Sequence, residues 1–208
     1  MCDFPNVENN VFELEALSAF CEDWNRRIVF LGELSERGRR DEALILCCCY
    51  IEAIGTWFTG WERGGKETFA MALLTYAGGD IFSRINPWLL FEEIRRKEDT
   101  VKWEIILDKL ESAFTGFNAT FYPSAEITEA CRSALSGEEF TVLDKSIWMG
   151  TMANPAYSIT KCEGVHNGSA TLKGCGEIAL DFQLFYPALQ RVFEVARRLI
   201  MSGKIRVY

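Results

Sequence analysis

The eighteen residues DEALILCCCYIEAIGTWF, from Asp41 to Phe58, decide the fold. Apolar side chains recur at helical spacing and cover most of the helix circumference, which predicts a central helix that is buried on nearly every side. Two carboxylates open the stretch, and a glycine at position 60 ends it. The three successive cysteines, Cys47 to Cys49, spread around this helix, so they are interpreted as core packing.

Helical patterns continue on both sides of this stretch. Before it, Asn9 or Asn10 can cap a helix that ends near Gly32 or runs on toward Gly38. After it, helices are predicted over 66–77, from Pro87, and over 100–114, 126–135, 138–152, 156–166 and 185–201. The sequence therefore predicts one all-α domain over residues 1–208. We expect a helical bundle with helices inserted between its core pairs, and a small hairpin or irregular loop near 169–181.

Composition limits the function classes. The 208 residues carry a net charge of −8 and are 49% hydrophobic, which suits a globular protein but disfavours a general polyanion binder. Two short basic clusters, Arg37–Arg40 and Arg95–Lys97, fit solvated helix ends. Any nucleic acid must therefore be bound at a focused site.

The eight cysteines include three in a row, which do not form a disulfide framework. The first residues lack the basic and apolar regions of a secretory signal, and no apolar run reaches the roughly 20 residues that span a bilayer. We therefore expect a reduced, cytoplasmic protein without a membrane partner.

The only histidine lies in the string Lys161-Cys162-Glu163-Gly164-Val165-His166-Asn167-Gly168. An imidazole can exchange a proton near neutral pH, and a lysine five residues earlier can place a cation on the same phosphate. Alternatively, His166 caps a helix end, with Asn167-Gly168 as the stop. A zinc site formed with Cys162 and Cys175 lacks the close cysteine pair that structural zinc sites use, so no metal or cofactor is expected.

The stretch from Tyr157 to Gly168 resembles the signature of HEPN-type helical domains, in which an arginine precedes a histidine by four to six intervening residues. The resemblance implies a metal-independent ribonuclease that works as a homodimer on RNA. In that case His166 would take the 2′-hydroxyl proton, Lys161 would stabilise the charge on the phosphoryl oxygens, and Asn167 would orient the imidazole or the phosphate. Lys161 replaces the family's arginine and lacks its planar fork.

The alternative is a non-catalytic helical interaction module that binds a protein partner. The two hypotheses predict different surfaces. A ribonuclease exposes Lys161 and His166 in a cleft, whereas a module buries His166 or uses it as a cap and exposes an apolar patch elsewhere.

Overall fold

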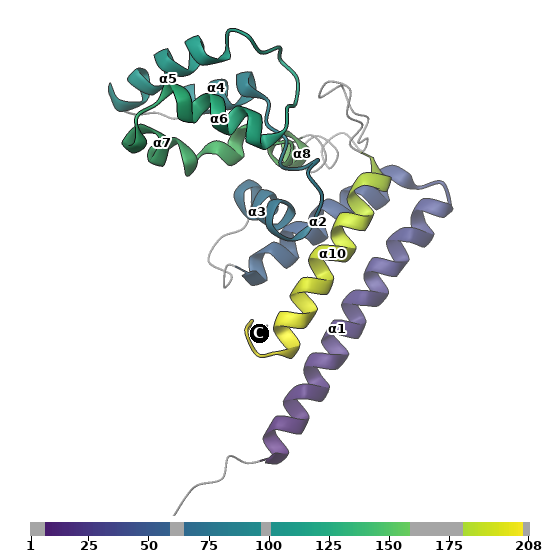
Figure 1. The fold of residues 1–208 in the computed structure, drawn as a ribbon. Coiled ribbons are helices and arrows are strands. Elements are labelled where there is room, and N and C mark those ends of the chain that lie inside the picture. The colour runs from purple at the N-terminus through teal and green to yellow at the C-terminus, as the bar shows by residue number, and fades with distance from the viewer. Residues whose placement is uncertain (1–6, 59–64, 97–100, 159–180, 206–208) are drawn as a thin grey trace, which may run out of the picture.

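The computed structural model describes residues 7–58, 65–96, 101–158 and 181–205, and every regular element in this part is a helix (Figure 1). The elements, in chain order, are α1 (Val7–Glu36), α2 (Arg40–Phe58), α3 (Lys66–Tyr76), α4 (Pro87–Arg95), α5 (Val101–Phe114), α6 (Ser124–Ala134), α7 (Gly137–Asp144), the 3₁₀ helix η1 (Ile147–Gly150), α8 (Ala153–Tyr157) and α10 (Phe182–Met201). The all-α prediction is confirmed.

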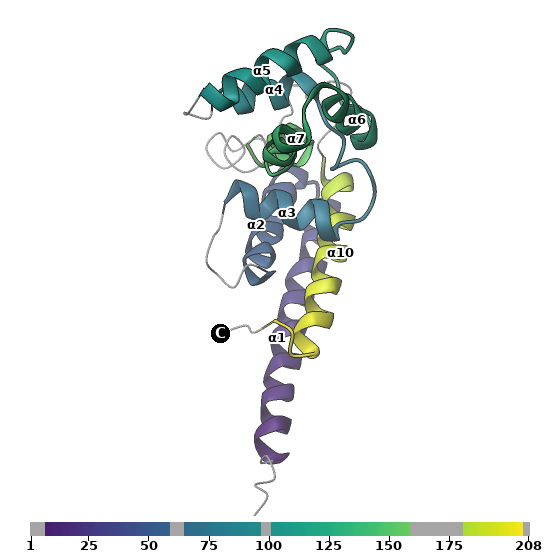
Figure 2. The same cartoon turned by 60° about the vertical axis from the view of Figure 1, so that its left-hand side comes forward.

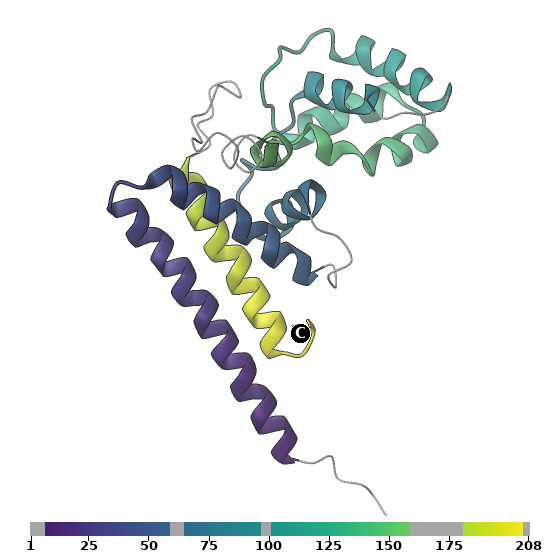
Figure 3. The same ribbon diagram turned by 180° about the vertical axis from the view of Figure 1, so that it is seen from behind.

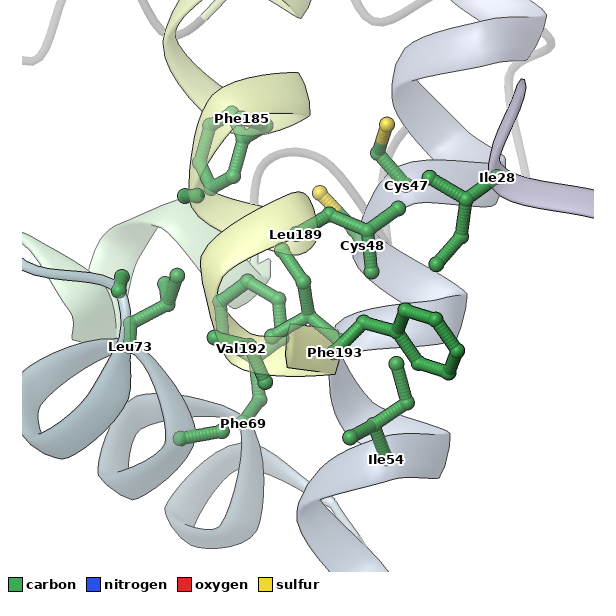
Figure 4. Packing of buried hydrophobic residues seen from close by; sticks show 14 of the residues in the cluster. Ile28, Cys47, Cys48, Ile54, Phe69, Leu73, Phe185, Leu189, Val192 and Phe193 are labelled. Carbon is green, nitrogen blue, oxygen red and sulfur yellow. The ribbon is translucent and has the colours of Figure 1, made fainter. Parts of the chain in front are cut away.

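Helices from both ends of the chain form a first group, the core lobe, consisting of α1, α2, α3, α8 and α10. In this lobe α10 packs between α2 and α1, and it runs antiparallel to α1 (Figures 1 and 3). Figure 4 shows the contact, in which Leu189 and Phe193 of α10 lie on the side of Cys48 and Ile54 of α2. Cys47 and Cys48 are fully buried there, so α2 is the central helix and these two cysteines are core residues, as predicted, whereas Cys49 is only partly buried.

Helices α4 to α7 and η1 form a second group, the insert lobe, between α3 and α8 in the chain (Figure 2). This lobe has its own buried cluster, which includes Leu90, Ile106, Phe114 and Cys131. The bundle therefore contains inserted helices, as expected. The two lobes are tied by Lys66 and Glu93, whose side chains lie 3.6 Å apart. That residues 1–208 form one domain stays a prediction.

Local signals place several helix starts as the sequence predicts. The Asn86 side chain accepts hydrogen bonds from the N–H groups of Trp88 and Leu89, and Pro87 occupies the first turn, where a missing N–H costs nothing. α1 begins at Val7, so the prediction that Asn9 or Asn10 caps it is wrong. At its other end α1 takes the longer of its two predicted courses. It continues through Gly32 and stops before Gly38, whose φ of 82° favours glycine.

The continuous helix predicted over 138–152 is wrong. α7 ends at Asp144, and the chain resumes as the short helix η1. The cause is tertiary packing, since the carbonyl of Gly150 accepts a hydrogen bond from the N–H of Asn86, and Thr151 pairs with Ile85. A continuous α-helix would not deliver these backbone groups to α4.

Two further predictions fall mostly outside the described residues. Of the helix expected over 156–166, only the first residues, in α8, are described. Of the hairpin or loop near 169–181, only Asp181 is described, and it serves as the N-cap of α10.

The lengths of the two antiparallel helices differ. α1 has 30 residues and α10 has 20, which correspond to about 45 and 30 Å of helix. The first part of α1 consequently extends past the end of α10 (Figures 1 and 3). Among the described helices, none has the combination of length and apolar composition needed to cross a bilayer.

Candidate functional site

The three predicted site residues, Lys161, His166 and Asn167, lie outside the described residues, as do Cys162 and Cys175 of the zinc alternative. The structure does describe the chain on either side of them. On the N-terminal side, the Tyr157 ring lies 5.4 Å from the Phe69 ring. On the C-terminal side, Asp181 accepts a hydrogen bond from the Leu184 N–H at 3.0 Å. Both flanks of the predicted site are thus anchored on the core lobe.

Within the described residues, the clearest surface feature is the open end of the α1–α10 groove. A cavity of about 110 Å³ lies there between the two helices. Its lining comes from both helices and comprises Ser18, Cys21, Glu22, Asn25, Arg197 and Met201. Met201 is 39% exposed, and Leu14, one helical turn before Ser18, is 48% exposed. We use the name "open end" for these seven residues.

The apolar side chains of α1 follow a heptad repeat that explains this surface. One position of the repeat holds Leu14, Cys21 and Ile28, and a second holds Leu17, Trp24 and Leu31. The later members are covered by the rest of the core lobe, with Ile28 2% and Leu31 0% exposed. Leu14 belongs to the same row but lies where α10 has ended.

The sequence predicts an apolar face on α1, but it does not predict that this face is exposed at the open end. The apolar residues of α1 recur every seven residues, and this spacing indicates a seam, that is, a face that packs against other helices. That spacing alone does not give the length of the helix that covers the seam. The end of α10 at Met201 is as predicted, but only the structure shows that α10 lies antiparallel to α1 and leaves its first turns uncovered.

Cys21 forms the floor of the cavity and is 3% exposed. Burial raises the pKa of its thiol above the usual value, and the nearby Arg197 opposes this effect only in part. A thiol that stays protonated near neutral pH is a poor nucleophile and behaves as a small apolar group. The cavity therefore suits an apolar side chain better than covalent chemistry.

A second, more open hollow of about 490 Å³ lies where α10 passes the end of α3, with Tyr76, Arg191 and Arg198 on its lining. Arg191 donates to the carbonyls of Ala77 and Gly78, at 3.0 and 3.4 Å, and so caps the end of α3. The Nη1 group of Arg191 is therefore engaged with the protein.

In the described ranges, no three His, Cys, Asp or Glu side chains gather as a metal ion would require. Comparisons with known proteins leave the resemblance open. No family model, no curated protein and no solved structure matches this chain. The open end of the groove consists of described residues of α1 and α10. We therefore take it as the candidate functional site.

Proposed function

We infer that this chain is a helical interaction module that binds a partner helix at the open end of the α1–α10 groove. The observation that carries this proposal is the exposure of Leu14, which stands in the same row as the buried Cys21 and Ile28. An exposed apolar surface is what the sequence analysis expects of an interaction module.

The energetics favour a partner. An isolated helical segment of a few turns is marginal in water, because its backbone order is not compensated by tertiary packing. The first turns of α1 extend past α10 and lack that helix as cover. A partner helix along the seam would bury Leu14 and Met201 and fill the cavity beside Cys21, which gains roughly 25 cal/mol for each Å² of apolar surface removed from water.

Site-specific photocrosslinking tests this function. A photoreactive amino acid replaces Leu14 in the full chain, which is expressed in its native cells and irradiated. Ile105 on α5 is the matched control position, since it is also 48% exposed. We expect one discrete protein adduct, identified by mass spectrometry, from position 14 and none from position 105. Equal or absent crosslinking at the two positions would overturn the proposal.

The second candidate function is metal-independent cleavage of RNA in the segment that holds Lys161, His166 and Asn167. Its support is the HEPN-type sequence string, together with the anchoring of both flanks on the core lobe. In this mechanism His166 removes the proton from a 2′-hydroxyl, and that oxygen attacks the adjacent phosphorus to form a 2′,3′-cyclic phosphate. The bond from phosphorus to the 5′-oxygen breaks, and the 5′-oxygen leaves with a proton from water. Lys161 stabilises the negative charge that develops on the phosphoryl oxygens, and Asn167 orients the imidazole or the phosphate. We place this activity in the cytoplasm.

Cleavage of a broad RNA panel by purified protein in EDTA tests the second candidate. Wild-type protein should cut, and His166→Ala should not, while circular dichroism shows that both are folded. A wild-type protein that leaves every RNA intact would remove this candidate and leave His166 as a helix cap.

A further inference from the structure

We propose that the partner at the open end is a second copy of this chain, bound antiparallel through a twofold axis that crosses α1 near Ser18. This inference rests on the proposed function, because it names the partner of the same surface. It adds an orientation, a self-complementary contact and a charge pairing, each of which is testable in purified protein.

The surface carries both halves of a contact. Leu14 projects from α1 as a knob, and the cavity beside Cys21 is a hole, seven residues or about 10 Å further along the same face. In a twofold interface, residue i of one copy meets residue j of the other, and residue j meets residue i. A knob and a hole on one face meet this requirement, since each copy inserts its own Leu14 into the other's cavity.

The cavity has a suitable size and chemistry for that side chain. Its volume is about 110 Å³, whereas a dry apolar cavity of about 150 Å³ accepts a benzene molecule. One branched aliphatic side chain therefore fits. Cys21 and Met201 offer polarisable apolar walls to such a knob, and the polar residues Ser18, Glu22, Asn25 and Arg197 complete the lining.

The offset between Leu14 and the cavity requires antiparallel helices, and the charges at the end of α10 suit this arrangement. Residues 7–23 hold five carboxylates and no cation, at Glu8, Glu13, Glu15, Glu22 and Asp23. From residue 191 to residue 204, α10 and the turn after it hold four cations, at Arg191, Arg197, Arg198 and Lys204, against one carboxylate, Glu194. All four cations are exposed. The antiparallel pair lays Glu15 of one copy beside the basic end of the other copy's α10, at a cavity that Glu22 also lines.

One ion pair follows directly from the knob and the hole. Arg197 lines the rim of the cavity, and Glu15 is the exposed residue after Leu14. When Leu14 of one copy enters the cavity of the other, Glu15 comes beside the second copy's Arg197. Within one copy, Arg197 has a different partner, Glu194, at 3.7 Å.

Sedimentation equilibrium of the purified full chain over a wide concentration range tests the proposal. We expect a monomer–dimer equilibrium in the wild type. Leu14→Glu should raise the dissociation constant about tenfold or more, as truncation of a central interface residue does, and Ile105→Glu should leave it unchanged. A monomeric wild type, or a dimer indifferent to Leu14→Glu, would overturn the proposal.

Reversing the charges of Glu15 and Arg197 in separate variants distinguishes the loss of an intermolecular contact from a folding defect. Glu15→Arg and Arg197→Glu should each weaken self-association, and an equal mixture of the two variants should restore dimers, because each unlike pair then recovers its opposite charges. A mixture that stays monomeric would contradict the pairing, even if Leu14→Glu failed to fold. If the wild type is monomeric but position 14 crosslinks to a different identified protein, the interaction module stands and the second copy is excluded.

Discussion

The carboxylate of Glu139 stays charged at a far lower pH than a glutamate in water. The Lys109 ammonium donates to both of its oxygens at 2.7 Å, and the Ser136 N–H donates to Oε2 at 2.8 Å. These contacts, the lysine first, hold the pKa of Glu139 at about 2. Because an unfolded glutamate has a pKa of about 4.3, this contact stabilises the fold above that pH and is lost progressively as the pH falls toward 2.

We therefore expect Glu139→Gln to lower the free energy of unfolding near neutral pH and to flatten its decline between pH 4.3 and 2. Urea unfolding at several pH values measures both effects. Glu138→Gln is the matched control, since Glu138 is exposed in the same first turn of α7. An equal flattening in that control would contradict the assignment to Glu139.

Lys161 is the residue at which the ribonuclease candidate departs from the family pattern. An arginine offers two parallel donors to a phosphate, whereas a lysine offers a single point charge. We expect Lys161→Arg to keep or raise the cleavage rate in EDTA, and Lys161→Ala to lower it about 10²-fold or more, as the loss of a transition-state donor does. Single-turnover RNA cleavage measures both rates. Equal losses in the two variants would show that the charge of residue 161 is not used.

At the level of elements, η1 crosses α4 so closely that only glycine fits at the contact. A Cβ added to Gly150 would lie 2.5 Å from the Cβ of Leu90 and 3.2 Å from its Cα. We expect Gly150→Ala to destabilise the fold by about 1–3 kcal/mol through overpacking, as measured by urea unfolding. Gly116→Ala is the control, because an added Cβ there meets nothing within 4 Å. Comparable losses in both variants would mean that overpacking is not the cause.

The same crossing shows what the sequence could and could not predict. Helix starts marked by local chemistry, such as Asn86-Pro87, were predicted because the cap and the first turn are neighbours in the chain. The break between α7 and η1 was missed because its cause is a hydrogen bond from the Asn86 N–H to the Gly150 carbonyl, across more than sixty residues. An apolar pattern alone does not encode that contact.

The candidate site also combines a feature that the sequence predicts with one that depends on contacts between distant helices. The heptad row through Leu14 and Cys21 is present in the sequence, so a packing seam on α1 could be predicted. Its exposure depends on the end of α10 at Met201 and on the antiparallel arrangement of the two helices. The string around His166 remains a sequence-based prediction, since residues 159–180 lie outside the described part of the chain.

At the scale of the whole molecule, the two lobes differ in how completely they bury their apolar side chains. The insert lobe closes its own hydrophobic cluster, and it meets the core lobe through short contacts such as Lys66 with Glu93. The core lobe joins both ends of the chain around α2 and leaves one end of its α1 seam exposed at Leu14. Association through α1 would therefore connect two core lobes and would need no rearrangement of the inserts.

Such association makes thermal stability depend on protein concentration, since a partner that binds only the folded chain stabilises it by mass action. For a chain of this size we expect the Tm of the wild type to rise by about 1–3 °C for each tenfold increase in concentration, as calorimetry would measure. Leu14→Glu should remove this dependence, and Ile105→Glu should keep it. Added salt should weaken it, because salt screens the attraction between the acidic part of α1 and the basic end of α10. A wild-type Tm that is constant with concentration would mean that the exposed seam does not pair with its own copy.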